Sequence, residues 1–374
     1  MTIAISGTTG ITLDGQFNSA SSMGFKNRII NGAMVIDQRN AGASVTPVNG
    51  AYTLDRWVYS SSQASKFTVE QTITGVAAPV GFSDYLGATV ASAVTIGAGD
   101  FFSISQSIEG FNFADMAWGT ASASTVTLSF WVRSSLTGTF GGALRNSAGN
   151  RSYPFTYTIS SANTWEQKSV TIAGDTSGTW IGATNGIGVT ILFGLGVGST
   201  YSGTAGAWAG SNFLSATGAT SVVGTNGATF YITGVQLEKG SQATAFDYRP
   251  YSTELQLCQR YCHVFRGATD ATYSNIGFGT CFDSTSLSVG ITMPVQMRVQ
   301  PTITYSAVGD MALHLPGLVR LTATSVTTQS TQSGPFRVCL AIGFASNGNI
   351  VSHKIAHFEF NNTSTGWLAL AAEM

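Results

Sequence analysis

The residues of this chain that can do acid–base chemistry are few and unevenly spread. The chain has four histidines, and His263 is the first. The part before it therefore cannot supply a Ser-His-Asp or Cys-His catalytic set of its own. Glu109 with Asp115, or Glu166 with Asp175, are the residue types of a glycosidase, which needs two carboxyl groups about 5 to 10 Å apart. Nothing in the sequence brings either pair to that separation, so we predict that the protein is not an enzyme.

Two groups of metal-ligating residue types occur, and neither has the spacing of a common metal site. On a helix Cys258 and Cys262 share a face, His263 points about 100° away, and no second ligand pair follows. His353 and His357, on or near an expected strand, would share one face but offer only two ligands. We therefore expect no metal site and interpret the two cysteines as small apolar residues in a helix seam.

Aromatic residues in polar loops are candidates for sugar binding. A pyranose face stacks on Trp or Tyr, while its hydroxyl groups bond to Asn, Asp, Gln or Arg. Such residues near Gly, Ser, Asn or Asp in expected loops are Trp118, Trp165, Trp180, Tyr201 and Trp208. Each also suits a packing role. The surroundings of Trp180, Tyr201 and Trp208 are the most loop-like, so we name these three as candidate glycan-binding residues.

Charge and hydropathy exclude several classes of protein. Only 9% of the residues are charged and the formal net charge is −1, which excludes a basic nucleic-acid binder. A hydrophobic content of 43% argues against a disordered chain. The longest apolar run, residues 187–198, is broken by glycines and too short to span a membrane. The first 22 residues lack the pattern of a secretory signal.

Residues 25–250 are expected to form one β-sandwich of jelly-roll type. Alternating or apolar runs recur there between Gly, Asn and Ser, without helical periodicity. The clearest inner strand is Thr125–Arg133, with Val126, Leu128, Phe130 and Val132 on one face. The glycine-rich residues 194–224 are expected to be an exposed loop that meets a ligand or a neighbouring subunit.

A short linking helix over residues 251–266 and a smaller β domain over residues 267–374 are expected to follow. Ser252 or Thr253 can cap the helix, and Gly267 ends it. About half of its circumference is apolar, more than packing against one surface requires. We expect contacts with neighbouring subunits through Leu255, Cys258, Tyr261, Cys262 and Phe265. The fold class is thus all-β apart from this helix.

Two pairs of charges lie among apolar residues near the start of the chain. Asp37-Gln38-Arg39 and Asp55-Arg56-Trp57 predict a buried or half-buried network of arginine and carboxylate groups. Ligand binding is the alternative role for these residues. If the network is structural, substitution of Arg56 damages folding more than binding.

Several motifs in a fixed order resemble the signature of bacteriophage tail fibre and minor structural proteins. They are Asn27–Arg39, Tyr52–Trp57, Val235–Gly240 with Phe246–Tyr251, and Leu257–Tyr261. The resemblance covers about residues 25–265. In that group a jelly-roll domain of carbohydrate-binding-module type is followed by a short linking helix.

The resemblance implies a virion protein, most often a tail fibre or receptor-binding protein that recognises host-surface glycans. Residues 1–24 would be an arm that attaches to other phage tail or head proteins, and the chain would be a homotrimer assembled in the host cytoplasm. It implies no cofactor, with a structural calcium ion left open, and no membrane insertion. The alternative is a head or tail decoration or fibre component with a purely structural role. A glycan depolymerase is disfavoured by the scarcity of acids and the lack of a repetitive shaft.

Overall fold

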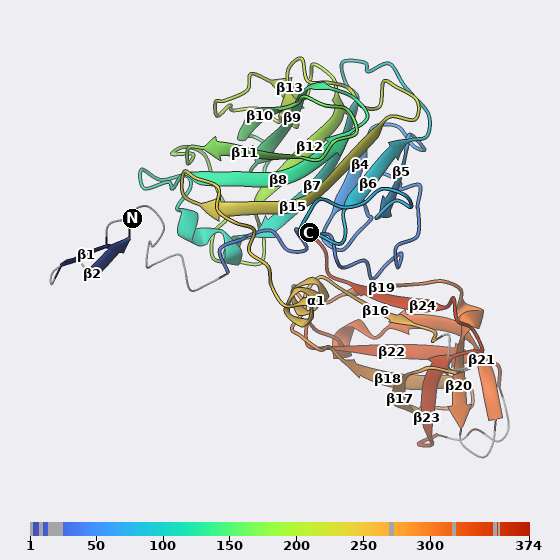
Figure 1. The fold of residues 1–374 in the computed structure, drawn as a ribbon. Coiled ribbons are helices and arrows are strands. Elements are labelled where there is room, and N and C mark those ends of the chain that lie inside the picture. Colours follow the sequence, from blue (N-terminus) through green and yellow to red (C-terminus); the bar gives the residue numbers. More distant parts are fainter. Residues whose placement is uncertain are drawn as a thin grey trace. The chain divides into compact units, whose positions relative to one another are not determined.

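The computed structural model describes residues 3–6, 10–13, 25–268, 273–315, 319–346, 350 and 352–374. Strands dominate them, and they divide into two compact units (Figure 1). The larger unit comprises residues 1–34, 46–51 and 59–249, and the smaller unit comprises residues 35–45, 52–58 and 250–374. The prediction of one uninterrupted domain over residues 25–250 did not anticipate that two early segments belong to the smaller unit.

The expected attachment arm lies largely outside the described residues. Within residues 1–24 the structure describes only an antiparallel hairpin of β1 (Ile3–Ser6) and β2 (Gly10–Leu13). The attachment role of this segment therefore stays a prediction.

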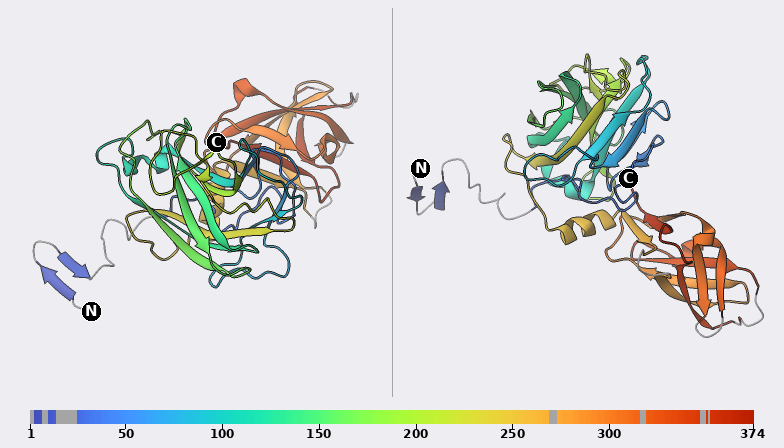
Figure 2. Two further views of the ribbon diagram at one scale, coloured as in Figure 1. Left: turned by 90° about the horizontal axis from the view of Figure 1, so that it is seen from above. Right: turned by 45° about the vertical axis from the view of Figure 1, so that its right-hand side comes forward.

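The larger unit is a sandwich of two sheets, which confirms the jelly-roll fold class (Figure 2). The six-stranded sheet has the order β10-β9-β12-β7-β4-β3, with bounds Ser152–Ile159, Gly138–Arg145, Ile187–Val197, Phe101–Glu109, Val58–Ser61 and Ala51–Tyr52. The five-stranded sheet has the order β11-β8-β15-β6-β5, with bounds Glu166–Ile172, Val126–Ser134, Thr229–Lys239, Leu86–Val90 and Phe67–Gln71. Two short 3-10 helices, η1 (Gly110–Asn112) and η2 (Ala114–Met116), follow β7.

The two sheets meet through the inward faces of their strands. The expected inner face of β8, Val126, Leu128, Phe130 and Val132, is completely buried, as predicted. Phe130 packs edge-on against Phe193 at 5.0 Å and Tyr157 at 4.9 Å, both from the opposite sheet. Burial of each such large side chain contributes about 1.5 to 3 kcal/mol, so this layer is the main source of stability for the sandwich.

The outer face of the six-stranded sheet is covered by the chain itself. Residues 201–216, here called the strap, carry the short parallel pair β13 (Ser202–Gly203) and β14 (Ser215–Ala216). Gly141 of β9 permits the approach, since a Cβ atom there would lie 2.5 Å from Ser215 Oγ. Ala143, Leu192 and Leu214 form a small buried core beneath the strap. The expectation of an exposed loop holds for residues 204–207 and 210–212, whereas apolar residues such as Leu214 pack back onto the sheet.

The smaller unit contains a closed barrel and a three-stranded sheet. The barrel order is β17-β18-β22-β21-β20-β23, with bounds Asn275–Cys281, Ser286–Thr292, Arg337–Phe344, Val319–Thr328, Met311–Leu315 and Ile355–Phe360. The sheet order is β16-β24-β19, with bounds Cys262–Arg266, Trp367–Ala371 and Thr302–Tyr305. Two 3-10 helices, η3 (Val308–Asp310) and η4 (Ser330–Gln332), belong to this unit. Buried residues of the barrel and of β24 share one apolar core.

The linking helix is shorter than expected. Helix α1 spans Tyr251–Gln259, its N-cap is Pro250 without a side-chain cap, and β16 begins at Cys262. The expected second half of the helix is a strand because Cys262 to Arg266 pair with β24, and this tertiary pairing overrides the local helical pattern. Within the described part of the chain no helix is long and apolar enough to cross a membrane.

The shorter helix changes which residues can form the expected subunit interface. Cys258, Tyr261 and Cys262 are completely buried within the chain. They are therefore corrected to core residues, because side chains without exposed surface have nothing to offer a neighbouring subunit. Leu255 and Phe265 are partly exposed and stay candidates for an interface.

Candidate functional site

Three tryptophans from separate loops of the larger unit meet at one place. Trp118 lies 4.8 Å from Trp180 and 5.0 Å from Trp208, measured between ring centroids, and Trp180 lies 5.4 Å from Trp208. The three rings are nearly perpendicular, with interplanar angles of 79° to 82°. Edge-to-face pairs of this kind are worth about 0.5 to 1.5 kcal/mol each beyond buried area. We call these residues the tryptophan cluster.

Hydrogen bonds fix the orientation of each indole ring. Trp118 Nε1 donates to the carbonyl oxygen of Ser124 at 2.8 Å, and Trp208 Nε1 donates to that of Ala173 at 2.8 Å. Trp180 Nε1 is shared between the Ser177 carbonyl oxygen at 3.1 Å and a carboxylate oxygen of Asp175 at 3.2 Å. The rings are therefore held in place before any ligand arrives.

A charged pair lies directly beside the cluster. Arg151 Nε and Nη2 donate to the two carboxylate oxygens of Asp175 at 2.7 and 2.6 Å, which is a two-pronged ion pair. Asp175 is 2% exposed, whereas 20% of the Arg151 side chain is exposed. Hydrogen bonding to Asp175 raises the pKa of Arg151, so the guanidinium keeps its charge. Nη1 takes no part in this pair and can donate to a ligand.

The exposure of the rings determines what the cluster can do. Trp118 is 6% exposed and forms its centre, whereas Trp180 and Trp208 are half-buried. Tyr153 packs against the outer side of Trp208 at 5.2 Å. Half-exposed rings beside a fixed guanidinium combine stacking with hydrogen bonding, which are the two interactions that hold a sugar ring.

The structure unites two of the three predicted glycan-binding residues and separates the third. Trp180 and Trp208 are in contact, but Tyr201, at the start of the strap, packs edge-on against Phe101 at 5.5 Å. Tyr201 therefore lies apart from the tryptophan cluster, and because it is half-buried its glycan-binding role stays a separate prediction. Trp118 was among the loop aromatics noted from the sequence, but no sequence signal pointed to Arg151.

Three of the four acids considered as glycosidase carboxylates take part in ion pairs. Glu166 binds Lys168 at 2.6 Å and accepts hydrogen bonds from two backbone N–H groups, and these bonds lower its pKa against the opposing effect of desolvation. Asp175 is engaged by Arg151, and Asp115 by Arg28 at 2.8 Å. These contacts give Glu166, Asp175 and Asp115 structural partners.

The smaller unit contains the predicted network of arginine and carboxylate groups. Arg39 Nη2 lies 3.0 Å from Glu373 Oε1, and Arg56 Nη1 donates to the other oxygen of Glu373. The Arg56 guanidinium also lies over the ring of Tyr261, 3.5 Å from its centroid. Asp55 accepts a hydrogen bond from the backbone N–H of Gln38 at 2.9 Å. We call Arg39, Asp55, Arg56, Tyr261 and Glu373 the ionic cluster.

Burial dominates the electrostatics of the ionic cluster. The Arg56 side chain is 1% exposed and the Glu373 side chain 9%. Desolvation raises the pKa of Asp55 to about 6, although Arg39 and Gln38 act in the opposite direction. Desolvation also raises the pKa of Cys258 and Cys262, which favours the neutral thiol. Most of the cluster is buried, with Arg39 the most exposed member at 17%, and we interpret its role as structural.

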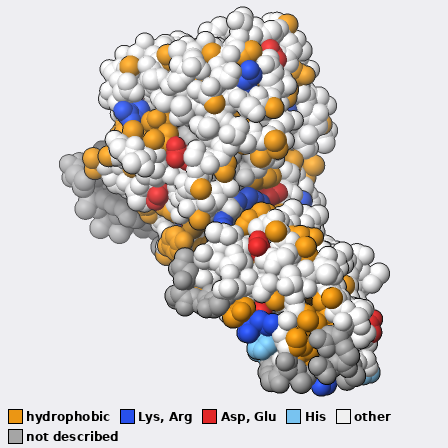
Figure 3. Space-filling view, turned by 90° about the vertical axis from the view of Figure 1, so that its right-hand side faces the viewer, with side chains coloured by type: hydrophobic (Ala, Val, Ile, Leu, Met, Phe, Trp, Pro, Cys, Tyr) orange, Lys and Arg blue, Asp and Glu red, His pale blue; other side chains and the backbone are white. Residues whose placement is uncertain are grey.

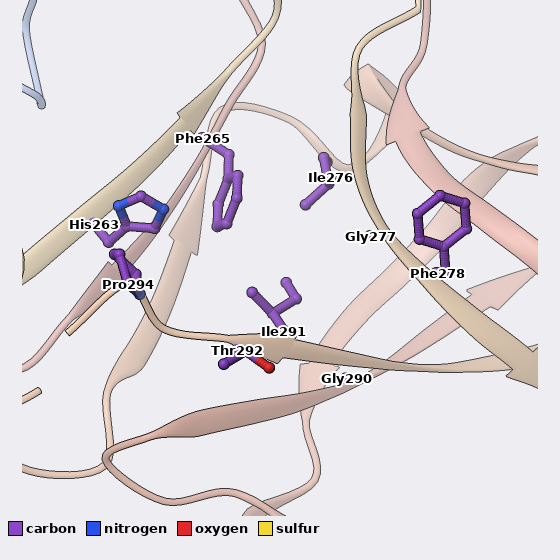
Figure 4. A pocket seen from close by; sticks show the side chains of 9 residues that line it. All are labelled: His263, Phe265, Ile276, Gly277, Phe278, Gly290, Ile291, Thr292 and Pro294. Atoms are coloured by element: carbon purple, nitrogen blue, oxygen red, sulfur yellow. The ribbon is translucent and has the colours of Figure 1, made fainter. Parts of the chain in front are cut away.

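A shallow hollow of about 380 Å³ opens on the smaller unit (Figure 4). Phe265, Ile276 and Ile291 point into the same space, with His263 beside Pro294 at its edge. Burial lowers the pKa of His263, which favours the neutral imidazole. The hollow is therefore apolar, and it contains no pair of groups that could move a proton.

The surface shows no continuous charged field on the face drawn in Figure 3. Lys, Arg, Asp and Glu side chains are scattered there among uncharged polar groups. This agrees with the low charged fraction of the sequence and directs the search for binding residues to aromatic rather than basic patches.

No protein-family model and no curated protein sequence matches this chain. Three solved structures that match part of it are a bacteriophage CBA120 tailspike protein 4 enzymatically active domain, TmCBM61 in complex with beta-1,4-galactotriose, and a family 11 carbohydrate-binding module from Clostridium thermocellum in complex with a beta-1,3-1,4-mixed-linked tetrasaccharide. The tailspike domain has 15% identity and a TM-score of 0.31, over 57% of this chain and 22% of that one. TmCBM61 has 11% identity and a TM-score of 0.30, over 57% of this chain and 99% of that one. The family 11 module has 9% identity and a TM-score of 0.27, over 53% of this chain and 97% of that one.

The chain spans about a fifth of that tailspike domain. All three TM-scores lie well below the level at which a shared ligand or activity can be inferred. The case for a function therefore depends on the side chains described above.

Proposed function

We propose that the larger unit binds glycans non-catalytically through Trp180, Trp208 and Arg151. The observation that carries this proposal is the contact between two half-exposed indole rings beside a fixed guanidinium. A pyranose ring stacks its C–H face on an exposed indole, and its hydroxyl groups accept hydrogen bonds from Arg151. Stacking and hydrogen bonding need no proton transfer, so the proposal requires no catalytic pair.

The biological setting of this proposal is the surface of a bacteriophage particle. The ordered motifs from Asn27 to Tyr261 support a tail fibre or receptor-binding protein, and the glycan would then be a polysaccharide of the host surface. A homotrimer is part of the same proposal. Native mass measurement of the full chain tests the trimer, and antibody labelling of intact particles tests the location.

The binding test compares three matched tryptophans. Trp180→Ala and Trp208→Ala remove the half-exposed rings, whereas Trp165→Ala removes a half-exposed ring whose indole N–H also donates to a backbone carbonyl, at 2.8 Å, outside the cluster. On an array of bacterial surface polysaccharides, we expect the first two variants to lose about tenfold in affinity, which corresponds to a loss of about 1.4 kcal/mol of stacking energy. We expect Trp165→Ala to bind as the parent does. Absence of saturable binding by the parent, or equal loss in all three variants, would contradict the proposal.

A purely structural role is the second candidate, and one observation favours it. All three indole N–H groups of the cluster donate within the chain, and the strap covers the outer face of the six-stranded sheet. These are properties of a packing cluster and of a sandwich that serves as a spacer. A decoration or fibre component of this kind would bind no polysaccharide on the array. It would instead occupy a fixed number of sites on each phage particle.

A further inference from the structure

Three side chains with metal-binding atoms meet on the outer face of the barrel. His314 of β20 lies directly opposite His357 of the neighbouring strand β23. Glu359 is two residues further along β23, so it faces the same side as His357. The ligand atoms of the three residues all lie within 4.8 Å of one another, and His314 Nδ1 is 3.6 Å from Glu359 Oε2. His353, which was expected to share a face with His357, lies in a turn before β23 and outside this group.

The surroundings hold the carboxylate in a fixed position. The side chain of Glu359 is 5% exposed, although it projects from the outer face of the barrel. Arg320 of β21 donates from Nε to Oε1 of this carboxylate, and its guanidinium lies over Tyr273, 3.6 Å from the ring centroid. The other oxygen, Oε2, is the one nearer His314. One carboxylate oxygen thus faces the arginine and the other faces the imidazole groups.

We propose that His314, His357 and Glu359 bind a divalent transition-metal ion of the zinc class. Imidazole nitrogen and carboxylate oxygen are the ligands that Zn²⁺ accepts, with bonds of about 2.0 to 2.2 Å. Such bonds require ligand atoms about 3.4 Å apart in a tetrahedral site. The His314–Glu359 separation of 3.6 Å already meets this requirement. Small side-chain rotations bring His357 to the ion, and a water molecule completes the coordination.

The positive charge of Arg320 opposes the binding of a cation at this site. Its Nη2 lies 3.4 Å from His314 Nδ1, so its positive charge is close to the position of the ion. A bound cation is repelled by this charge and shares Glu359 with it. Arg320 therefore weakens metal binding while it positions the carboxylate.

The first test is calorimetric titration of ZnCl₂ into the full chain, with Co²⁺ as a spectroscopic probe. His314→Ala and His357→Ala each remove one ligand from the outer face of the barrel, where truncation leaves the apolar core intact. The matched control is His353→Ala, because His353 is exposed and its ring bonds to Ser352 Oγ at 2.7 Å outside the site. We expect at least about a tenfold loss of zinc affinity in the first two variants and none in the control.

Co²⁺ should give the visible absorption of a tetrahedral site in the parent and in His353→Ala only. Zinc should raise the Tm of the same two proteins, because it binds the folded state. If the parent binds no zinc, or if His314→Ala and His357→Ala bind as tightly as His353→Ala, binding is adventitious and the proposal is overturned.

The second test measures whether removal of the Arg320 charge raises or lowers zinc affinity. Arg320→Gln removes the nearby positive charge and should raise zinc affinity by about tenfold. Glu359→Gln removes the anionic ligand and should lower it. An unchanged or lower affinity in Arg320→Gln would contradict the placement of the ion beside the guanidinium.

Discussion

The tryptophan cluster of the larger unit and the ionic cluster of the smaller unit are both assembled from distant parts of the sequence, but different forces hold them. The first is an apolar arrangement of perpendicular rings that leaves Trp180 and Trp208 half-exposed. The second buries Arg56 almost completely and leaves only 9% of the Glu373 side chain exposed, and it is held by paired opposite charges. A cluster that keeps exposed surface can bind a ligand, whereas a closed one can only stabilise its unit. The difference is why we assign binding to the first and stability to the second.

The largest expected effect is loss of the shared carboxylate in the ionic cluster. Glu373→Ala deprives both Arg39 and Arg56 of this partner in a buried setting, and we expect the free energy of unfolding to fall by about 3 to 5 kcal/mol. Hydrogen exchange at β16 and β24 should report this loss, because both strands belong to the smaller unit. Glycan binding by the larger unit should survive in the folded fraction. Unchanged exchange at these strands would show that the cluster is not a source of stability.

Truncation at the centre of the tryptophan cluster should cost less. Trp118→Ala removes a ring that is 6% exposed and leaves a cavity, for which we expect a loss of about 3 kcal/mol. Trp208→Ala, at a half-exposed position, should cost about 1 kcal/mol and act mainly on binding. Urea denaturation of the two variants measures this difference. Equal losses of stability in the two variants would contradict the view that Trp118 serves packing and Trp208 serves binding.

The pH dependence of stability should separate the two clusters further. The pKa of Asp55 is about 6 in the folded chain, above the value of about 3.9 for an unfolded aspartate. The folded state therefore holds an extra proton between these values, and the contribution of Asp55 to stability falls as pH rises from about 4 to 6, by up to about 3 kcal/mol. Comparison with Asp55→Asn at each pH isolates this contribution. A difference between the two proteins that does not change with pH would contradict the assignment.

The smallest effect is expected at an ion pair on the surface. Arg28 and Asp115 are 2.8 Å apart, but their side chains are 24% and 47% exposed. Arg28→Ala should lower the free energy of unfolding by less than about 1 kcal/mol. The same denaturation measurement provides the baseline against which Glu373→Ala is judged.

Local pattern predicted the sandwich well and predicted long-range contacts poorly. The alternation of Val126, Leu128, Phe130 and Val132 identified an inner strand because burial on one face repeats every second residue. The apolar pattern after Gln259 suggested more helix, but pairing with β24 made this segment a strand, a choice that depends on residues about a hundred positions later.

The candidate sites show the same limit. Loop-like surroundings made Trp180, Tyr201 and Trp208 candidates, but only Trp180 and Trp208 are in contact, whereas Tyr201 packs against Phe101. Arg151 and Glu373 carried no local signal, because their importance comes from partners that fold next to them. The pairing of β20 with β23, which places His314 opposite His357, likewise could not be predicted from the sequence.

The composition of the smaller unit has a consequence for synthesis on the ribosome. Arg56 and the carboxylate it binds are 317 residues apart in sequence. At translation rates of about 5 to 20 residues per second, Arg56 emerges roughly 15 to 60 seconds before Glu373 exists. During that interval residues 35–45 and 52–58 have no completed unit to join, so nascent chains should be most vulnerable to proteases in these two early segments.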